Sequence, residues 1–156
     1  MGDQTPWDAA RAAVIIEQHQ DRDGAALPIL HALNDAFGHV PTDAIPMVAA
    51  ALNLTRAEVY GIASFYHDFR RTRPGRHRLH LCRAEACQAM GAERLHDAAR
   101  RRLGIDWHET TADGAVTLEP VFCLGLCAVA PSGMLDGVPL GRLDPAGLDA
   151  ALESAR

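Results

Sequence analysis

All four cysteines of this 156-residue chain lie in two closely spaced pairs. The pairs have the spacings C-x4-C and C-x3-C, with residues 88–122 between them: Cys82, Cys87, Cys123 and Cys127. Thiolates are soft ligands that favour zinc, copper(I) or iron–sulfur clusters, so four of them can surround one metal centre. We therefore take these four cysteines as the candidate metal and cofactor site.

The spacing alone leaves more than one chemistry open. Zinc sites accept gaps of about two to four residues between cysteines, which admits both pairs. The usual zinc ribbon has C-x2-C twice, however, whereas the wider first pair is similar to the opening C-x4-C of plant-type ferredoxins. A thiol–disulfide oxidoreductase would carry C-x-x-C, which the chain lacks. A 2Fe–2S cluster is therefore favoured, with zinc and with free or disulfide-bonded thiols as the alternatives.

Composition and charge restrict the class of protein. A net charge of −5 and a pI near 5.9 argue against nucleic acid as a partner. No apolar run approaches the roughly 18 residues of a membrane helix, so no membrane insertion is expected. The N-terminus lacks the basic and apolar regions of a secretory signal, and a cytoplasmic, reducing location is the expectation. In a reducing compartment, cysteine pairs are more often metal ligands or redox groups than structural disulfides.

Each cysteine pair is expected to follow a β-strand. Residues 77–81 alternate between polar and apolar side chains, as a half-buried strand does, and Cys82 comes next. The dipeptide Asp113-Gly114 predicts a hairpin over residues 107–122, whose second strand leads to Cys123. Two strand ends in one sheet can bring the two pairs to a shared site.

Helices and a second hairpin are expected to complete this half of the chain. One helix is predicted from Cys87 to about Leu103, where Gly104 ends it. Residues 134–138 predict a tight hairpin, and Asp144-Pro145 predicts the start of a final helix. The expected architecture is a compact α/β layer of sheet covered by two helices.

The first half of the chain predicts four short helices. The first follows a start signal at Thr5-Pro6, the second spans residues 26–37, the third begins after Pro41, and the fourth follows a capping box at residues 55–58. This half contains no cluster of titratable residues, which favours a scaffold or docking role. The turn signal at Pro74-Gly75 places the boundary there, giving a helical docking domain over 1–74 and a cluster domain over 75–156.

Several phrases around the cysteines resemble a known family, the thioredoxin-like 2Fe–2S ferredoxin subunits. Its members include the 24-kDa subunit of respiratory complex I, the diaphorase subunit of NAD-reducing hydrogenases and the gamma subunit of NAD-dependent molybdenum formate dehydrogenases. The matching phrases, beside the cysteine spacing, are Leu27–Leu33, Val59–Tyr66, Thr110–Gly114 and Thr117–Pro120. Within the family, Phe65–Arg70 and Cys82–Gln88 are most similar to the formate dehydrogenase gamma subunit.

The resemblance implies a thioredoxin-like fold for the second half, holding one 2Fe–2S cluster. It assigns Cys82 and Cys87 to one iron and Cys123 and Cys127 to the other, with no catalytic residue in this chain. The cluster would exchange single electrons with FMN on a flavoprotein subunit that also binds NAD. The other expected partner is a formate dehydrogenase catalytic subunit with a molybdenum cofactor and further iron–sulfur clusters, so the chain would function in a hetero-oligomer.

Two kinds of alternative remain. The first is the equivalent subunit of complex I or of a hydrogenase diaphorase. The second is a protein without an iron–sulfur cluster, either a zinc-stabilised adaptor or a thiol oxidoreductase.

Overall fold

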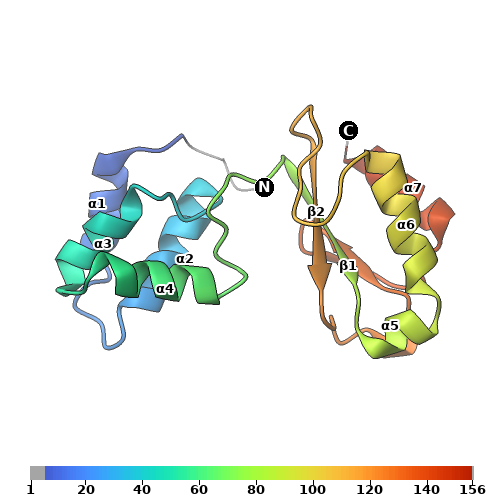
Figure 1. Cartoon of the computed structure of the whole chain (residues 1–156), viewed down its shortest axis with the longest axis horizontal. Helices are drawn as coiled ribbons and strands as arrows, with labels where there is room; N and C mark the ends of the chain where they lie inside the picture. Colours follow the sequence, from blue (N-terminus) through green and yellow to red (C-terminus); the bar gives the residue numbers. More distant parts are fainter. Residues whose placement is uncertain (1–5, 156) are drawn as a thin grey trace. The chain divides into compact units, whose positions relative to one another are not determined.

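A computed structural model describes residues 6–155 and divides the chain into two compact units (Figure 1). The first unit ends at Arg73 and the second begins at Pro74. Each unit has its own hydrophobic core. Among the described residues, none of the helices combines the length and the apolar character needed to cross a lipid bilayer.

The first unit contains the four expected helices. Their bounds are Ala9–Glu17 (α1), Ala26–Phe37 (α2), Ala44–Leu52 (α3) and Arg56–Phe65 (α4). Local signals end two of them: Gly38 and Asn53 are left-handed and close α2 and α3. The start of the first helix differs from the expectation, because Asp8 caps it by accepting from the Ala10 and Arg11 N–H groups. Thr5, the expected cap, lies outside the described residues.

The four helices surround one apolar core. Ile29, Leu30 and Leu33 of α2 have no exposed surface, and Val48 of α3 and Val59 of α4 complete the same cluster. These positions recur at helical spacing, so one stripe of each helix faces inward. The unit is a small helical bundle built from local sequence signals.

The second unit is a four-stranded sheet with the strand order β2-β1-β3-β4. The strands are His77–Cys82 (β1), Val116–Val121 (β2), Gly133–Leu135 (β3) and Val138–Leu140 (β4). β1 and β2 pair in parallel, whereas β3 pairs antiparallel with both β1 and β4. A parallel pair requires a crossover connection, and here helices supply it.

Three helices belong to this sheet: Glu85–Ala89 (α5), Ala92–Leu103 (α6) and Pro145–Ser154 (α7). Figure 1 shows α6 and α7 on the same face of the sheet. Their apolar side chains pack against fully buried strand residues, including Leu79, Leu81 and Leu118. This is the mixed α/β arrangement, with two helices on a sheet, expected for the second half.

Two local predictions for this unit were wrong. The single helix expected from Cys87 to Leu103 is divided at Gly91, which has a φ of 81° that an α-helix cannot contain. The hairpin expected over residues 107–122 is reduced to β2 and an isolated antiparallel bridge between Thr110 and Thr117. His108, with a φ of 66°, interrupts the first of its two strands.

Candidate metal centre

The first cysteine pair lies at the end of the central strand. Cys82 is the last residue of β1, and Cys87 lies in the short helix α5 that follows. Both side chains are buried, each with 2% of its surface exposed. The strand end is held on both sides, because the Cys82 N–H donates to the Ser132 carbonyl at 3.0 Å and the Arg83 N–H donates to the Val121 carbonyl at 2.8 Å.

The second pair lies in the loop after β2. Cys123 and Gly125 both have positive φ, 80° and 76°, which folds the loop back on itself before the 3-10 turn Cys127–Val129. The Cys123 and Cys127 sulfurs are 3.7 Å apart, and the Gly125 N–H donates to the Cys123 sulfur at 3.4 Å. Two thiolates bound at roughly 2.3 Å to one tetrahedral metal would lie about 3.8 Å apart. This pair therefore already has the separation of two ligands on one metal.

Polar groups of both loops lie near the Cys82 sulfur and affect its pKa. Burial by itself raises the pKa of the Cys82 thiol, but opposing hydrogen bonds outweigh it and lower that pKa below its usual value. The groups that lower this pKa are the Cys87 side chain and the backbone N–H groups of Ala84, Cys123 and Leu124. Because the last two belong to the second loop, the structure brings the two pairs together.

Cys127 contacts the Cys123 sulfur and lies within electrostatic range of Cys87. Its pKa is raised, first by the hydrogen bond with the Cys123 side chain and then by the negative charges of Cys123 and Cys87. The four cysteines predicted from the sequence therefore meet at one end of the sheet, one pair buried and one pair exposed. Within residues 6–155, no set of three or more histidine, cysteine or acidic side chains is arranged to hold one metal ion.

A 2Fe–2S centre needs only two cysteines for each iron, and the Cys123 and Cys127 sulfurs have the separation of such a pair. All the donors are thiols, which suits iron–sulfur chemistry, and the backbone N–H groups directed at sulfur are the contacts that stabilise and tune such a cluster. The residues present are therefore chemically suited to the cofactor that the cysteine spacing favours.

Ser132 and His96 contact the first pair, and sequence reasoning assigned a role to neither. Ser132 is 2% exposed, and its Oγ lies 3.4 Å from the Cys87 sulfur. His96 is also buried, and its Nε2 lies 3.1 Å from the Cys82 carbonyl oxygen, so Nε2 carries the donated proton. Burial lowers the pKa of His96 and favours the neutral ring. No local pattern marks either residue, because both contacts depend on long-range packing.

His96 is in turn held by an aromatic residue. The Trp107 ring meets the His96 ring edge-on, with 5.3 Å between centroids, and the Arg83 guanidinium lies 5.2 Å from the Trp107 centroid. Arg83 directly follows Cys82, so this stack encloses the backbone of the first ligand. Its geometry depends on where the loop after α6 places Trp107.

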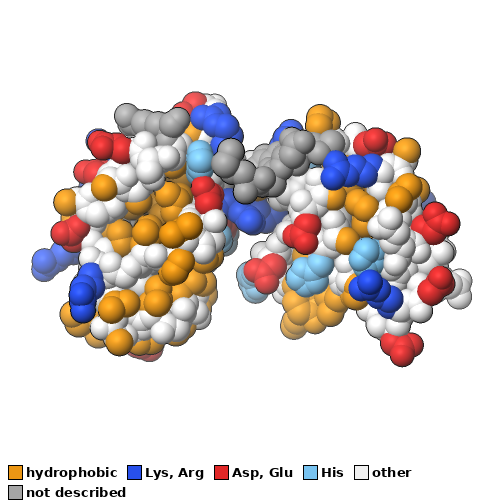
Figure 2. Space-filling model, turned by 180° about the vertical axis from the view of Figure 1, so that it is seen from behind, with side chains coloured by type: hydrophobic (Ala, Val, Ile, Leu, Met, Phe, Trp, Pro, Cys, Tyr) orange, Lys and Arg blue, Asp and Glu red, His pale blue; other side chains and the backbone are white. Residues whose placement is uncertain are grey.

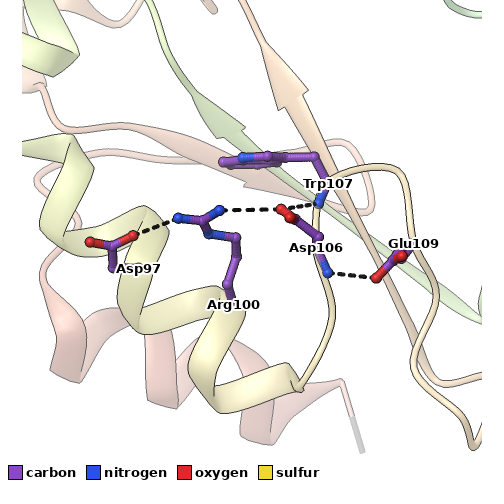
Figure 3. Close-up of polar contacts among 5 residues, drawn as sticks. All are labelled: Asp97, Arg100, Asp106, Trp107 and Glu109. Atoms are coloured by element: carbon purple, nitrogen blue, oxygen red, sulfur yellow. Dashed lines mark hydrogen bonds and ion pairs between the residues drawn. The ribbon is translucent and has the colours of Figure 1, made fainter.

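Figure 3 shows the polar contacts that hold this loop. The Arg100 guanidinium pairs with the Asp97 carboxylate at 2.7 Å and with the Asp106 carboxylate at 3.3 Å. The Asp106 carboxylate also accepts from the Trp107 N–H at 2.8 Å, and the Asp106 N–H donates to Glu109 at 2.7 Å. The hydrogen bond with Arg100 lowers the pKa of Asp97. These contacts link the end of α6 to the turn that carries Trp107.

Comparison with known proteins identifies a family. Residues 12–156 match the model of the thioredoxin-like [2Fe-2S] ferredoxin family. A subunit of an NADH-quinone oxidoreductase of Rhizobium meliloti is 40% identical over 139 residues, which cover 89% of this chain and 83% of that relative. The HndA subunit of the NADP-reducing hydrogenase of Solidesulfovibrio fructosivorans is 31% identical over 130 residues, covering 83% of this chain and 76% of that relative.

Solved structures include a similar fold. A chain of an NAD+-reducing [NiFe]-hydrogenase, in an air-oxidized crystal structure, aligns with a TM-score of 0.69 at 30% identity. The alignment covers 81% of this chain but only 22% of that chain. The names of these relatives refer to NADH-quinone oxidoreductases and hydrogenases, whereas the sequence phrases pointed first to formate dehydrogenase. That finer assignment stays a prediction.

Proposed function

The chain belongs to the thioredoxin-like [2Fe-2S] ferredoxin family, and we propose that it is an electron-transfer subunit of a complex that oxidises or reduces a nicotinamide cofactor. Its own cofactor is one 2Fe–2S cluster. The observation that carries the proposal is that both cysteine pairs lie at the same end of two parallel-paired strands, where Cys82 is opposite Val121. The relatives in NADH-quinone oxidoreductases and hydrogenases support the nicotinamide-linked assembly.

The proposed ligands are the four cysteines. Cys82 and Cys87 would hold one iron, and Cys123 and Cys127 the other. When bound, a 2Fe–2S cluster accepts and releases one electron at a time. The buried pair excludes water from its side of the site, while the N–H groups directed at sulfur favour negative charge there. The exposed pair leaves the other side open to a partner.

Exposed apolar side chains support the docking of partner subunits. Met90 and Phe122, each three or fewer residues from a cysteine of the site, are 62% and 71% exposed. In the helical unit, Tyr60, Phe65 and Tyr66 are exposed as well, and Figure 2 shows hydrophobic side chains on the surface of both units. Such side chains are typical of subunit interfaces. We propose that one partner is a flavoprotein subunit that binds FMN and NAD.

The identity of the whole complex has two candidates. The names of the relatives favour an assembly of the NADH-quinone oxidoreductase or NAD-reducing hydrogenase type. The phrases Phe65–Arg70 and Cys82–Gln88 favour a formate dehydrogenase, whose catalytic subunit would carry a molybdenum cofactor and further iron–sulfur clusters. The reducing cytoplasm is the proposed location, since it keeps the thiols available for cluster assembly.

Metal analysis of the full chain, purified without oxygen, tests the cofactor. We expect two iron atoms and two acid-labile sulfides per chain, with an electron paramagnetic resonance signal that develops on one-electron reduction. The Cys127→Ala variant should lose iron, while Ser64→Ala, in the helical unit, should keep it. Equimolar zinc without sulfide would replace the proposal with the zinc adaptor, and a metal-free chain with disulfide reductase activity would replace it with the thiol oxidoreductase.

Purification of the tagged chain from its native host tests the complex. A flavoprotein companion is expected in every case. Nickel and iron in the companions would identify a hydrogenase, a membrane assembly would identify an NADH-quinone oxidoreductase, and molybdenum with formate-dependent NAD reduction would identify a formate dehydrogenase. A chain that copurifies with no flavoprotein would contradict the proposed partner.

A further inference from the structure

Ser132 is a buried side chain that connects the two cysteines of the first pair. Its carbonyl oxygen accepts from the Cys82 N–H at 3.0 Å, and its Oγ lies 3.4 Å from the Cys87 sulfur. Within residues 6–155, the Ser132 hydroxyl has the Cys87 sulfur as its hydrogen-bond partner. With 2% of Ser132 exposed, water does not compete for the contact. One residue thus contacts both ends of the C-x4-C loop.

The direction of this hydrogen bond follows from the chemistry of the site. Between a thiol and a hydroxyl, either group could donate. A cysteine that binds a metal does so as a thiolate and has no proton on sulfur. Once Cys87 is a ligand, the Ser132 hydroxyl must therefore be the donor and the Cys87 sulfur the acceptor. A hydrogen bond to a charged acceptor is stronger than one between neutral groups.

The hydroxyl is held in place by the sheet. Ser132 immediately precedes β3, where Gly133 is paired with Leu81. The two strands approach so closely here that a Cβ on Gly133 would lie 2.8 Å from the His80 carbonyl oxygen. On the other side of Ser132, the Pro131 carbonyl accepts from the Leu143 N–H at 2.9 Å. With both flanking residues fixed, the backbone of Ser132 is held in place, and its burial restricts the rotation of the side chain.

We propose that Ser132 is a positioning residue whose O–H group donates to the Cys87 sulfur and thereby raises the reduction potential of the bound cluster. The proposal rests on the proposed function. One-electron reduction increases the negative charge that the ligand sulfurs share, so a hydrogen bond to sulfur becomes stronger in the reduced state. The reduced state is stabilised more than the oxidised state, and the potential rises.

Ser132 can be separated from the other donors by mutation. The N–H groups that lower the pKa of Cys82 belong to the backbone, and so does the Gly125 N–H that donates to the Cys123 sulfur. Backbone donors remain in any side-chain variant. The Ser132 donor is a side chain, and Ser132→Ala removes it while leaving the carbonyl that holds Cys82.

A redox titration of the Ser132→Ala chain, loaded with its cluster, tests the proposal. Iron and sulfide contents equal to those of the unaltered chain would first show that the site is intact. We then expect the equilibrium constant for one-electron reduction to fall by at most roughly tenfold, because the loss is the increase in strength of this hydrogen bond on reduction and the whole bond sets its upper limit. A tenfold fall lowers the potential of a one-electron couple by about 59 mV.

Two further variants control the experiment. Ser132→Thr keeps a hydroxyl and should restore most of the potential. Ser154→Ala removes an exposed hydroxyl that donates to the Ala151 carbonyl at 2.7 Å, and it should leave the potential unchanged.

The outcomes separate this proposal from the proposed function. An unchanged or raised potential in a fully loaded Ser132→Ala chain would overturn the role of Ser132 alone. If that variant fails to load, the Thr variant decides: loading with the original potential supports the hydroxyl, and failure overturns it. Failure of the unaltered chain to bind iron would instead overturn the proposed function.

Discussion

Gly133 is the position at which one added methyl group should disturb the second unit most directly. It lies in β3, opposite Leu81 of β1. An alanine Cβ there would lie 2.8 Å from the His80 carbonyl oxygen, 2.9 Å from a Leu143 methyl carbon and 3.0 Å from a Leu81 methyl carbon. Carbon atoms in contact are normally about 3.5–4.0 Å apart. The leucine side chains can adjust, but the His80 oxygen belongs to the strand backbone and cannot.

The loss of folding stability caused by Gly133→Ala can be estimated from these overlaps. Overpacking of this kind costs about 1–3 kcal/mol, and the backbone contact favours the upper part of that range. Replacement of a strand glycine by alanine by itself stabilises the fold by roughly 0.5–1 kcal/mol, because alanine loses less conformational entropy on folding. The net loss for Gly133→Ala is therefore about 1–2.5 kcal/mol, which lowers the melting temperature of a domain of this size by roughly 5–15 °C.

Thermal unfolding of the full chain with its cluster, followed by circular dichroism at one scan rate, measures this change. A fixed rate is needed because loss of the cluster makes unfolding irreversible. Gly61→Ala is the matched control, because nothing lies within 4 Å of the added carbon and the residue is inside α4, where alanine is the better helix former. The control should melt no lower than the unaltered chain. Equal melting of the two variants would refute the steric argument at Gly133.

Two further predictions concern hydrogen bonds. Thr117 is fully buried, and its Oγ1 accepts from the Gly75 N–H at 2.6 Å and contacts the Thr110 hydroxyl at 2.7 Å. Thr117→Val removes both contacts and should lower the free energy of unfolding by about 1–3 kcal/mol. An unchanged free energy of unfolding in urea titrations would contradict this prediction. Glu58 accepts from the Thr55 N–H and hydroxyl, with the backbone bond the larger cause, and its pKa is lowered from 4.5. The stabilising effect of ionised Glu58 is present above pH 4.5 and is lost as the pH falls through the lowered pKa. Carbon-13 NMR titration of the Glu58 carboxyl should show a midpoint below 4.5, which moves back up in Thr55→Ala. A midpoint at or above 4.5 in the unaltered chain would count against the capping box.

Local sequence signals were sufficient for much of the helical unit and for the strand ends. The Thr55–Glu58 capping box, the left-handed Asn53 and the strand that ends at Cys82 were all predicted from a few neighbouring residues, and all are confirmed. The wrong prediction of one continuous helix across Gly91 also came from neighbouring residues alone. A glycine within a helical pattern can be tolerated or can break the helix, and the neighbouring residues do not distinguish the two outcomes.

The sequence by itself determined which chemistry the chain can support, because the types and spacing of the four cysteines limit the ligands that one centre can have. Only the tertiary structure decided the surroundings of those ligands. Ser132 lies 45 residues from Cys87 in the chain, and it meets the sulfur because β3 pairs with β1 in one register. A shift of one residue would turn each side chain of β3 to the opposite face. Strand register is set by the packing of the whole sheet, so no local pattern could have revealed this contact.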